Sequence, residues 1–300
     1  MIDLKEVADN VFMLRIPVPI NVDAVNLYLF AGEIPTLLDA GTNTPEVLEA
    51  VHAGMKKVGI KKLEQVLISH WHVDHAGAAN TLAQEGARVF AGSRDYQEWT
   101  SFVQGEAFTR LNEWATREWG VPENVIPGML KISKRLQTFT ALPDQVNLLE
   151  PYQTIQAGNS LLQVIPTPGH TAGHLSFYAA KDSVLFSGDM LLPDEIPYPG
   201  IWEQEGIVVS GMPSYLESLN RIENLPSKVY LPGHGLPSDN LKARCQEIRG
   251  KLNKQMLRHS PAESVYASAS SLGGEAIHPG LLFIQLHYVY GWEQLKKKVG

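Results

Sequence analysis

The stretch Leu67-Ile68-Ser69-His70-Trp71-His72-Val73-Asp74-His75 places three histidines and a carboxylate within six positions. It overlaps the apolar run 66–68, which is short and β-branched at two of its three positions. Such a run predicts a buried strand. We therefore expect the polar residues on the loop that leaves the C-terminal end of this strand, where α/β sheets usually bind ligands. The small residues 76–79 then predict the start of a helix that holds this loop close to the sheet.

The residue types on this loop indicate metal binding. Neutral imidazole and carboxylate groups suit zinc, iron, manganese or nickel. His70 and His72 can direct two nitrogens at one ion if the loop is extended, while Asp74 and His75 point elsewhere. The alternative is a solvated loop that happens to be rich in histidine. Chance could account for one or two of the chain's ten histidines here, but not for this spacing with an acid between them.

Composition limits the class of protein. The 300 residues suffice for one large domain with an appendage or for two modest domains. The chain is 44% hydrophobic and 19% charged, as is usual for a soluble globular protein. A formal net charge of −7 provides no basic surface for nucleic acid or for an anionic membrane. We therefore expect a small-molecule substrate, with nucleic acid as a less favoured partner.

The cysteine content and the apolar runs of the sequence indicate where in the cell the protein is expected. The single Cys245 excludes an intrachain disulfide framework and a multi-cysteine zinc site, and its place in an apolar helical pattern predicts a core residue. The N-terminal residues lack the basic start and apolar core of a signal peptide. No apolar stretch approaches the ~18 residues that a membrane span requires. These features predict a cytoplasmic protein that does not enter the membrane.

The N-terminal part alternates between strands and helices. Apolar runs predict strands at 11–16, 25–30, 35–38 and 88–90. Thr44-Pro45 predicts the start of a helix, and Gly59 marks the end of that helix. This alternation is typical of the α/β class.

Residues 93 to about 137 have a different composition, which predicts helices interrupted near 120–122 and 127–128. This helical insertion carries Trp99, Phe102, Trp114 and Trp119. These aromatic residues either pack on the main domain or on a second copy in a homodimer, or they form a lid that lines a substrate cleft. Both interpretations stay open at this point.

One pattern recurs three further times, and it is the strongest evidence in the sequence. Apolar strands at 161–165, 184–186 and 229–231 each lead to a glycine and a metal-ligand residue type. The residues that follow these strands are His170, Asp189 and His234.

From residue 237 onward the pattern becomes helical. One helix is predicted along 241–256. A last helix is predicted from the spacing of apolar residues, namely Leu281, Ile284, Tyr288, Trp292 and Leu295.

The collected set resembles the metallo-β-lactamase fold superfamily, and all five of its motifs occur in order over residues 1–238. That set is Asp39, His70, His72, Asp74, His75, His170, Asp189 and His234. The resemblance implies an αββα sandwich, with metals at one edge between two sheets. It implies a catalytic domain over 1–238, containing the insertion at about 93–137. Residues 239–300 would then form a small helical C-terminal domain of winged-helix-like type.

The resemblance also implies a role for each site residue. His70, His72 and His170 would hold one metal ion, Asp74, His75 and His234 a second, and Asp189 would bridge them. Asp39 would orient a ligand by hydrogen bonding to it rather than bind metal itself. Two divalent ions are implied, with zinc favoured over iron or manganese.

One position separates the subfamilies. The true β-lactamases of this superfamily have cysteine or serine at the position of Asp189. An aspartate there resembles the glyoxalase II, lactonase and ribonuclease Z side, so antibiotic hydrolysis is not expected as the main activity. The insertion and helical tail resemble a group of bacterial hydrolases. The basic and tyrosine pattern that would hold glutathione in glyoxalase II is absent from this tail.

The expected function is that of a dinuclear metal-dependent hydrolase. A metal-activated hydroxide would attack a small ester-like substrate, with thioester or lactone favoured, and Asp74 would also accept a proton. Alternatives are a phosphodiesterase or endoribonuclease, a mononuclear iron dioxygenase that acts on a persulfide, and a non-catalytic binding module. Tyr198 lies on a proline-rich loop and either contacts substrate or packs. His174 is expected to hydrogen-bond at the rim of the site.

Overall fold

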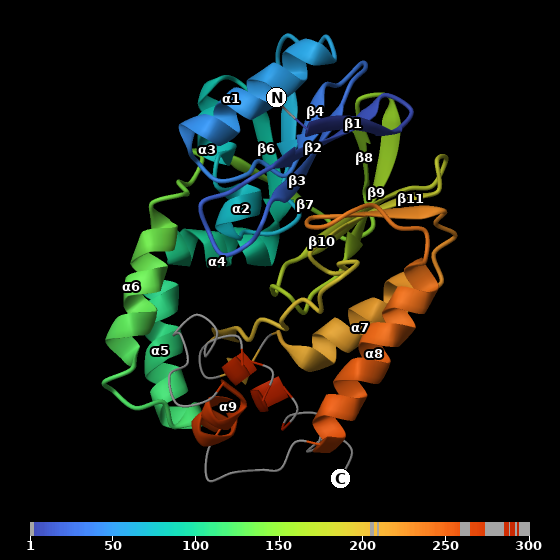
Figure 1. The fold of residues 1–300 in the computed structure, drawn as a ribbon. Coiled ribbons are helices and arrows are strands. Elements are labelled where there is room, and N and C mark those ends of the chain that lie inside the picture. The colour runs from blue at the N-terminus through green and yellow to red at the C-terminus, as the bar shows by residue number, and fades with distance from the viewer. Residues whose placement is uncertain are drawn as a thin grey trace.

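The computed structural model describes residues 3–204, 207–208, 210–258, 265–273, 285–287, 289–291 and 293. Two β-sheets face each other at its centre, and helices cover their outer sides (Figure 1). The prediction of an αββα sandwich is confirmed.

The first sheet has seven strands that follow one another in chain order. They are β1 (Asp3–Ala8), β2 (Val11–Ile16), β3 (Val25–Phe30), β4 (Thr36–Leu38), β5 (Gln65–Leu67), β6 (Arg88–Gly92) and β7 (Val146–Leu149). The pairs β1–β2, β2–β3 and β3–β4 are antiparallel, whereas the pairs β4–β5, β5–β6 and β6–β7 are parallel. Parallel neighbours need crossover connections, and α1 (Pro45–Lys57) supplies the one between β4 and β5. The C-terminal ends of β4 and β5 therefore meet at one edge of the sheet.

The second sheet has five strands in the order β14-β11-β10-β9-β8. They are β8 (Thr154–Ala157), β9 (Ser160–Pro166), β10 (Leu175–Ala179), β11 (Val184–Gly188) and β14 (Val229–Pro232). Strands β11 and β14 are parallel, so Asp189 and His234, which follow them, lie at the same edge of the sheet. A separate short hairpin joins β12 (Glu203–Gln204) to β13 (Ile207–Val208).

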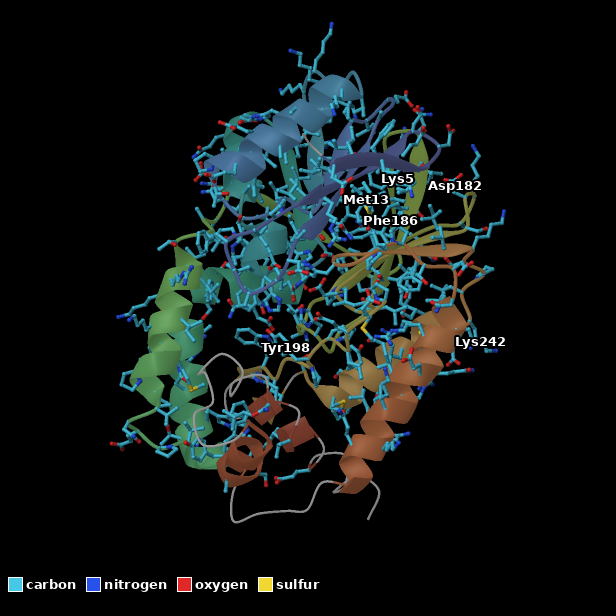
Figure 2. The ribbon with its side chains drawn as sticks, viewed as in Figure 1. Lys5, Met13, Asp182, Phe186, Tyr198 and Lys242 are labelled. Atoms are coloured by element: carbon cyan, nitrogen blue, oxygen red, sulfur yellow. The ribbon has the colours of Figure 1, made fainter. Side chains whose placement is uncertain are left out.

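Three apolar cores hold the layers together. Between the sheets, Met13 of β2 and Phe186 of β11 belong to one buried cluster, and both lie where the sheets face each other (Figure 2). Outside the first sheet, Val47 and Val51 of α1 pack in a second cluster. Outside the second sheet, α7 (Met212–Ile222) and α8 (Leu241–Arg258) form the third cluster (Figure 1).

The insertion is helical, as predicted, and comprises α4 (Ser93–Val103), α5 (Glu106–Trp119) and α6 (Ile126–Gln137). Trp99 and Phe102 are buried in the core beneath the first sheet, and Trp114 and Trp119 are buried in the core of the second. Trp99 and Phe102 therefore pack on the main domain, whereas the rings of Trp114 and Trp119 also contact Tyr290 and His287 of the C-terminal region. The interruption predicted at 127–128 is wrong, because proline is tolerated in the first turn of α6, where its missing N–H has no helical partner.

The described part of the C-terminal region contains α8 and α9 (Val265–Gly273), and α9 contacts α5. Cys245 lies fully buried in α8, as predicted, and burial raises the pKa of its thiol to about 12. The five apolar residues that predict the last helix lie outside the described residues. The boundary at 238 and the winged-helix-like character of the tail stay predictions. No helix in the described part of the chain is both long and apolar enough to span a membrane.

Candidate metal centre

The histidine-rich stretch leaves β5 and turns directly into a short helix. The carbonyl of His72 accepts hydrogen bonds from the backbone N–H groups of His75 and Ala76 at 2.9 and 2.8 Å, which closes the first turn of α2 (Val73–Ala76). The helix predicted to start at 76–79 therefore begins earlier, and α3 (Ala79–Gln84) follows it. As a result, Asp74 and His75 project from a helical turn, whereas His70 and His72 precede it.

Asp39 follows β4 with a left-handed backbone (φ 60°) and holds this stretch in place. Its carboxylate accepts hydrogen bonds from the N–H and hydroxyl of Ser69, each at 2.8 Å. The same carboxylate lies 2.8 Å from Nδ1 of His75. Asp39 thus fixes the ring of His75 with Nε2 directed into the site, which is how an outer carboxylate orients a metal-binding imidazole.

His70, His72 and His170 form what we call the first group. Nδ1 of His72 lies 3.0 Å from Nε2 of His70 and 3.0 Å from Nε2 of His170. Both of those partner rings are almost completely buried. The structure therefore brings together two segments that are about a hundred residues apart in the sequence.

Asp74, His75 and His234 form the second group. Nε2 of His75 and Nε2 of His234 are 3.2 Å apart, and Oδ2 of Asp74 lies 3.3 Å from the latter. Asp189 lies between the groups: its carboxylate oxygens are 3.4 Å from Nε2 of His75 and 3.6 Å from Nε2 of His170. Each group, and also the set His70, His75 and Asp189, has the spacing of a metal-binding cluster.

The hydrogen bonds on the outer side of the rings determine which nitrogen atoms carry a lone pair. Nδ1 of His170 lies 3.0 Å from the carbonyl of Tyr198, and Nδ1 of His234 lies 2.7 Å from the carbonyl of Ala24. Because a carbonyl can only accept, both Nδ1 atoms carry a proton, so Nε2 is the atom of each ring that can offer a lone pair to the site. Nε2 of His170 faces Nδ1 of His72 at 3.0 Å, and Nε2 of His234 faces Nε2 of His75 at 3.2 Å. Lone pairs that face one another at such distances repel each other unless a cation or a proton lies between them.

Asp189 also indicates that a cation or a proton belongs in the site, because its Oδ1 is buried without a hydrogen-bond partner among the described residues. A buried carboxylate oxygen without a partner is costly in free energy. The donor set of imidazole nitrogens and carboxylate oxygens therefore fits divalent cations.

The two groups differ in the pKa values of their histidines. Burial lowers the pKa of His72 to about 3 and lowers that of His70 as well. In the second group burial acts in the same direction, but the carboxylates of Asp189 and Asp74 outweigh it. They raise the pKa of His75 to about 10 and that of His234 to about 12.

Tyr198 and His174 occupy different sides of the site. The hydroxyl of Tyr198 lies 3.2 Å from Nε2 of His72, and Tyr198 is placed toward the centre of the molecule (Figure 2). His174 is fully buried, so its predicted place at the rim is wrong. Its Nε2 accepts a hydrogen bond of 3.1 Å from the N–H of Asp189, and its Nδ1 lies 2.8 Å from the hydroxyl of Thr167. His174 therefore fixes the backbone of Asp189 from beneath.

Two residues near the site were missed by sequence reasoning. Asp95, in the first turn of α4, is buried against the loops that carry His72 and His170. An acid in the first turn of a helix is ordinary, so no sequence signal distinguishes Asp95. His287 contacts the ring of Tyr198 with 5.6 Å between centroids, and its apolar surroundings in the sequence give no indication of this contact.

Comparison with known proteins agrees with this geometry. Residues 20–234 match the model of the metallo-beta-lactamase superfamily. The match covers more than half of the chain, and the chain belongs to this superfamily. The prediction of a metal-dependent hydrolase is confirmed at this level.

Individual relatives share less than a third of their residues with this chain. The chain is 28% identical over 259 residues to a probable metallo-hydrolase, YqjP, of Bacillus subtilis, which covers 83% of this chain and 78% of that protein. It is 21% identical to an atrochrysone carboxyl ACP thioesterase of Aspergillus fumigatus, over 77% of this chain and 57% of that protein.

Solved structures share the fold. A metallo-beta-lactamase family protein from Thermus thermophilus superposes with a TM-score of 0.81 at 22% identity, over 97% of this chain and 94% of that one. A beta-lactamase domain protein from Burkholderia ambifaria superposes with a TM-score of 0.82 at 22% identity, over 99% and 90% of the two chains.

Proposed function

We propose that this protein is a dinuclear metal-dependent hydrolase of a small ester-like substrate, with thioesters first and lactones second. The observation that carries the proposal is the convergence of two donor groups on one shared carboxylate, Asp189. Its oxygens lie 3.6 Å from Nε2 of His170 in the first group and 3.4 Å from Nε2 of His234 in the second. A carboxylate in that position can serve both groups.

The first group would hold one cation and the second group the other, with zinc favoured over iron or manganese. When bound, such a pair of cations lowers the pKa of water and polarises the substrate oxygen. The chain's own residues prepare this site in advance. Asp39 and the carbonyls of Ala24 and Tyr198 keep three imidazole rings in the tautomer that directs Nε2 inward.

Asp74 has a second proposed role as a proton acceptor. Its Oδ2 lies within 3.3 Å of Nε2 of His234, and it is nearly buried. Burial acts to raise its pKa, but His75 and His234 outweigh this and lower the pKa to about 2. Asp74 is therefore ionised at neutral pH, as an acceptor must be.

The proposed substrate class rests on a relative and on the charge of the chain. One relative is named as an acyl-carrier-protein thioesterase, which favours a thioester. The acidic balance of the chain, with a net charge of −7, disfavours a nucleic-acid substrate, whose phosphates attract basic surfaces.

The test couples elemental analysis of the purified protein to a hydrolysis screen with thioesters, lactones, phosphodiesters and RNA. We expect about two zinc, iron or manganese ions per chain, and turnover of thioesters or lactones that His72→Ala abolishes. His52→Ala is the matched control, because His52 lies on the surface in an ion pair with Glu85 at 2.9 Å. It should retain both the ions and the activity.

Other outcomes would redirect the proposal. One iron per chain, with oxygen uptake in the presence of a persulfide and no hydrolysis, would support the dioxygenase alternative. Turnover of phosphodiesters or RNA alone, with binding that weakens steeply with salt, would support the nuclease alternative.

A further inference from the structure

A carboxylate outside the two donor groups joins the segments that carry the first group. Oδ2 of Asp95 accepts hydrogen bonds from the backbone N–H of Trp71 and from the hydroxyl of Thr171, each at 2.9 Å. Oδ1 accepts a hydrogen bond of 2.6 Å from the N–H of Gly173. Asp95 itself is 1% exposed.

Two of these three donors adjoin histidines of the first group, and Gly173 lies on the same loop as His170. Trp71 stands between His70 and His72, and Thr171 directly follows His170. The chain between Trp71 and Thr171 includes the whole helical insertion and the strands that start the second sheet. One carboxylate therefore connects two loops that belong to different sheets.

The packing around Asp95 leaves it little freedom to move. A Cβ atom added to Gly173 would lie 2.3 Å from the backbone nitrogen of Asp95, and one added to Gly92 would lie 2.6 Å from the carbonyl oxygen of Gly173. The absence of side chains at these two positions allows the start of α4 to rest directly on the loop of His170. The insertion is thereby anchored at the first group through its first turn.

We propose that Asp95 is a positioning residue that holds the two ligand-bearing loops at the spacing which the first group needs to bind a cation. This proposal rests on the proposed function, because it presupposes that the first group binds metal. The nitrogen atoms of His72 and His170 approach to 3.0 Å, so a small shift of either loop would separate them. Within the described part of the chain, no hydrogen bond joins Asp95 to the second group, whose rings are held by Asp39 and by the carbonyl of Ala24 instead.

The experiment measures the affinity of each site for Co²⁺ by its visible absorption during titration against a competing chelator. Asp95→Asn keeps the shape of the side chain but turns an amide N–H toward an N–H or hydroxyl donor. Loss of a partner that supports metal ligands typically costs 10- to 100-fold in metal affinity. We expect that loss at one Co²⁺ site, and the other site to stay within about twofold.

A double variant identifies which site is weakened. Asp74→Asn removes a donor of the second group only. In that background, Asp95→Asn should lower the affinity of the remaining site by the same factor as in the wild-type background. If Asp95→Asn leaves the affinity of the remaining site unchanged in that background, the proposal is overturned.

Two milder variants decide the matter should Asp95→Asn fail to fold. Thr171→Val removes one donor to Asp95 and should weaken the same site by about tenfold, the effect of one lost hydrogen bond to a charged group. Thr171→Ser keeps the hydroxyl and should restore the affinity. Equal affinities in the valine and serine variants would contradict the proposal.

Ser218→Ala is the matched control for a general loss of buried hydrogen bonds. The hydroxyl of Ser218 donates to the carbonyl of Pro168 at 2.7 Å on the same loop, but it does not reach the segment of His70 and His72. This variant should lower thermal stability while both Co²⁺ affinities stay unchanged. If it weakens Co²⁺ binding as much as Asp95→Asn, Asp95 has no special role. A wild-type protein that binds no Co²⁺ would instead overturn the proposed function together with this inference.

Discussion

The two donor groups are about equally buried, but they are prepared for a cation in different ways. The first group consists of imidazoles alone, and burial holds the pKa of its histidines low, at about 3 for His72. The second group contains a carboxylate of its own, and the carboxylates of Asp189 and Asp74 raise the pKa of His234 to about 12. One group thus presents free lone pairs at neutral pH, whereas the other holds protons that a cation must displace. The difference shows that a shared carboxylate does not make the two halves of a site equivalent.

The largest effect should follow from removing the carboxylate that both groups share. Asp189→Asn deletes the negative charge within 3.4 Å of His75 and His234 and within 3.6 Å of His170. Removing one member of a buried set of charges typically costs about 3–5 kcal/mol. We expect turnover to fall about 100- to 1000-fold and both ions to be lost on dialysis, as elemental analysis would show. Retention of both ions would mean that Asp189 does not serve the two groups jointly.

A smaller effect, confined to the second group, is expected for Asp74→Asn. The variant should lose about one ion per chain and about 100-fold in turnover, within the range that a proton acceptor contributes. Turnover measured at saturating zinc separates the two roles of Asp74. A variant that keeps its metal and its full activity would show that Asp74 accepts no proton.

The proton content of the groups predicts different responses to pH. The pKa of His75 is raised to about 10 and that of His234 to about 12, so both are protonated near neutral pH before a cation binds. Affinity at the second group should therefore rise with pH between about 6 and 9, by about tenfold per pH unit for each proton displaced. The first group should show little change, because its lowered pKa values leave it unprotonated.

Calorimetric titration with zinc in two buffers of different ionisation enthalpy counts the protons released. The first ion should release almost none and the second about one or two. Equal proton release for the two ions would remove the distinction between the groups.

The smallest effect should come from Tyr198, which touches the first group only. Its hydroxyl lies 3.2 Å from Nε2 of His72, on the side away from the other donors. If this hydroxyl contacts substrate, Tyr198→Phe should lower kcat/KM about tenfold, the effect of one hydrogen bond, with both ions retained. If steady-state kinetics give the same kcat/KM for Tyr198→Phe and for wild type, Tyr198 has a packing role alone.

The sequence could predict those parts of the fold and site that depend on local patterns. Each apolar strand followed by glycine and a ligand-type residue is a short-range signal, and parallel strands bring such ends to the same edge. Asp189 and His234, which follow the parallel strands β11 and β14, could therefore be expected at one edge of the sheet without the structure. The helix of Cys245 could be predicted from its apolar spacing for the same reason.

The features that escaped prediction depend on contacts between distant segments. His174 directly precedes β10, and its ring lies against the backbone of Asp189, which follows the neighbouring strand β11, so its burial depends on the pairing of these strands. Asp95 looks like an ordinary acid at a helix start, and only the packing of α4 on the loop of His170 reveals its three hydrogen bonds. The aromatic residues of the insertion could not be assigned to a lid or to a core by composition alone.

The central claim is that two unlike donor groups share Asp189 and hold one cation each. A crystal structure of the protein grown with zinc, with anomalous data collected at the zinc edge, tests it most directly. We predict two anomalous peaks, one among His70, His72 and His170 and one among Asp74, His75 and His234, with the carboxylate of Asp189 within bonding distance of both. A single peak in the first group, with Asp74 and His234 bound to no metal at saturating zinc, would contradict the account.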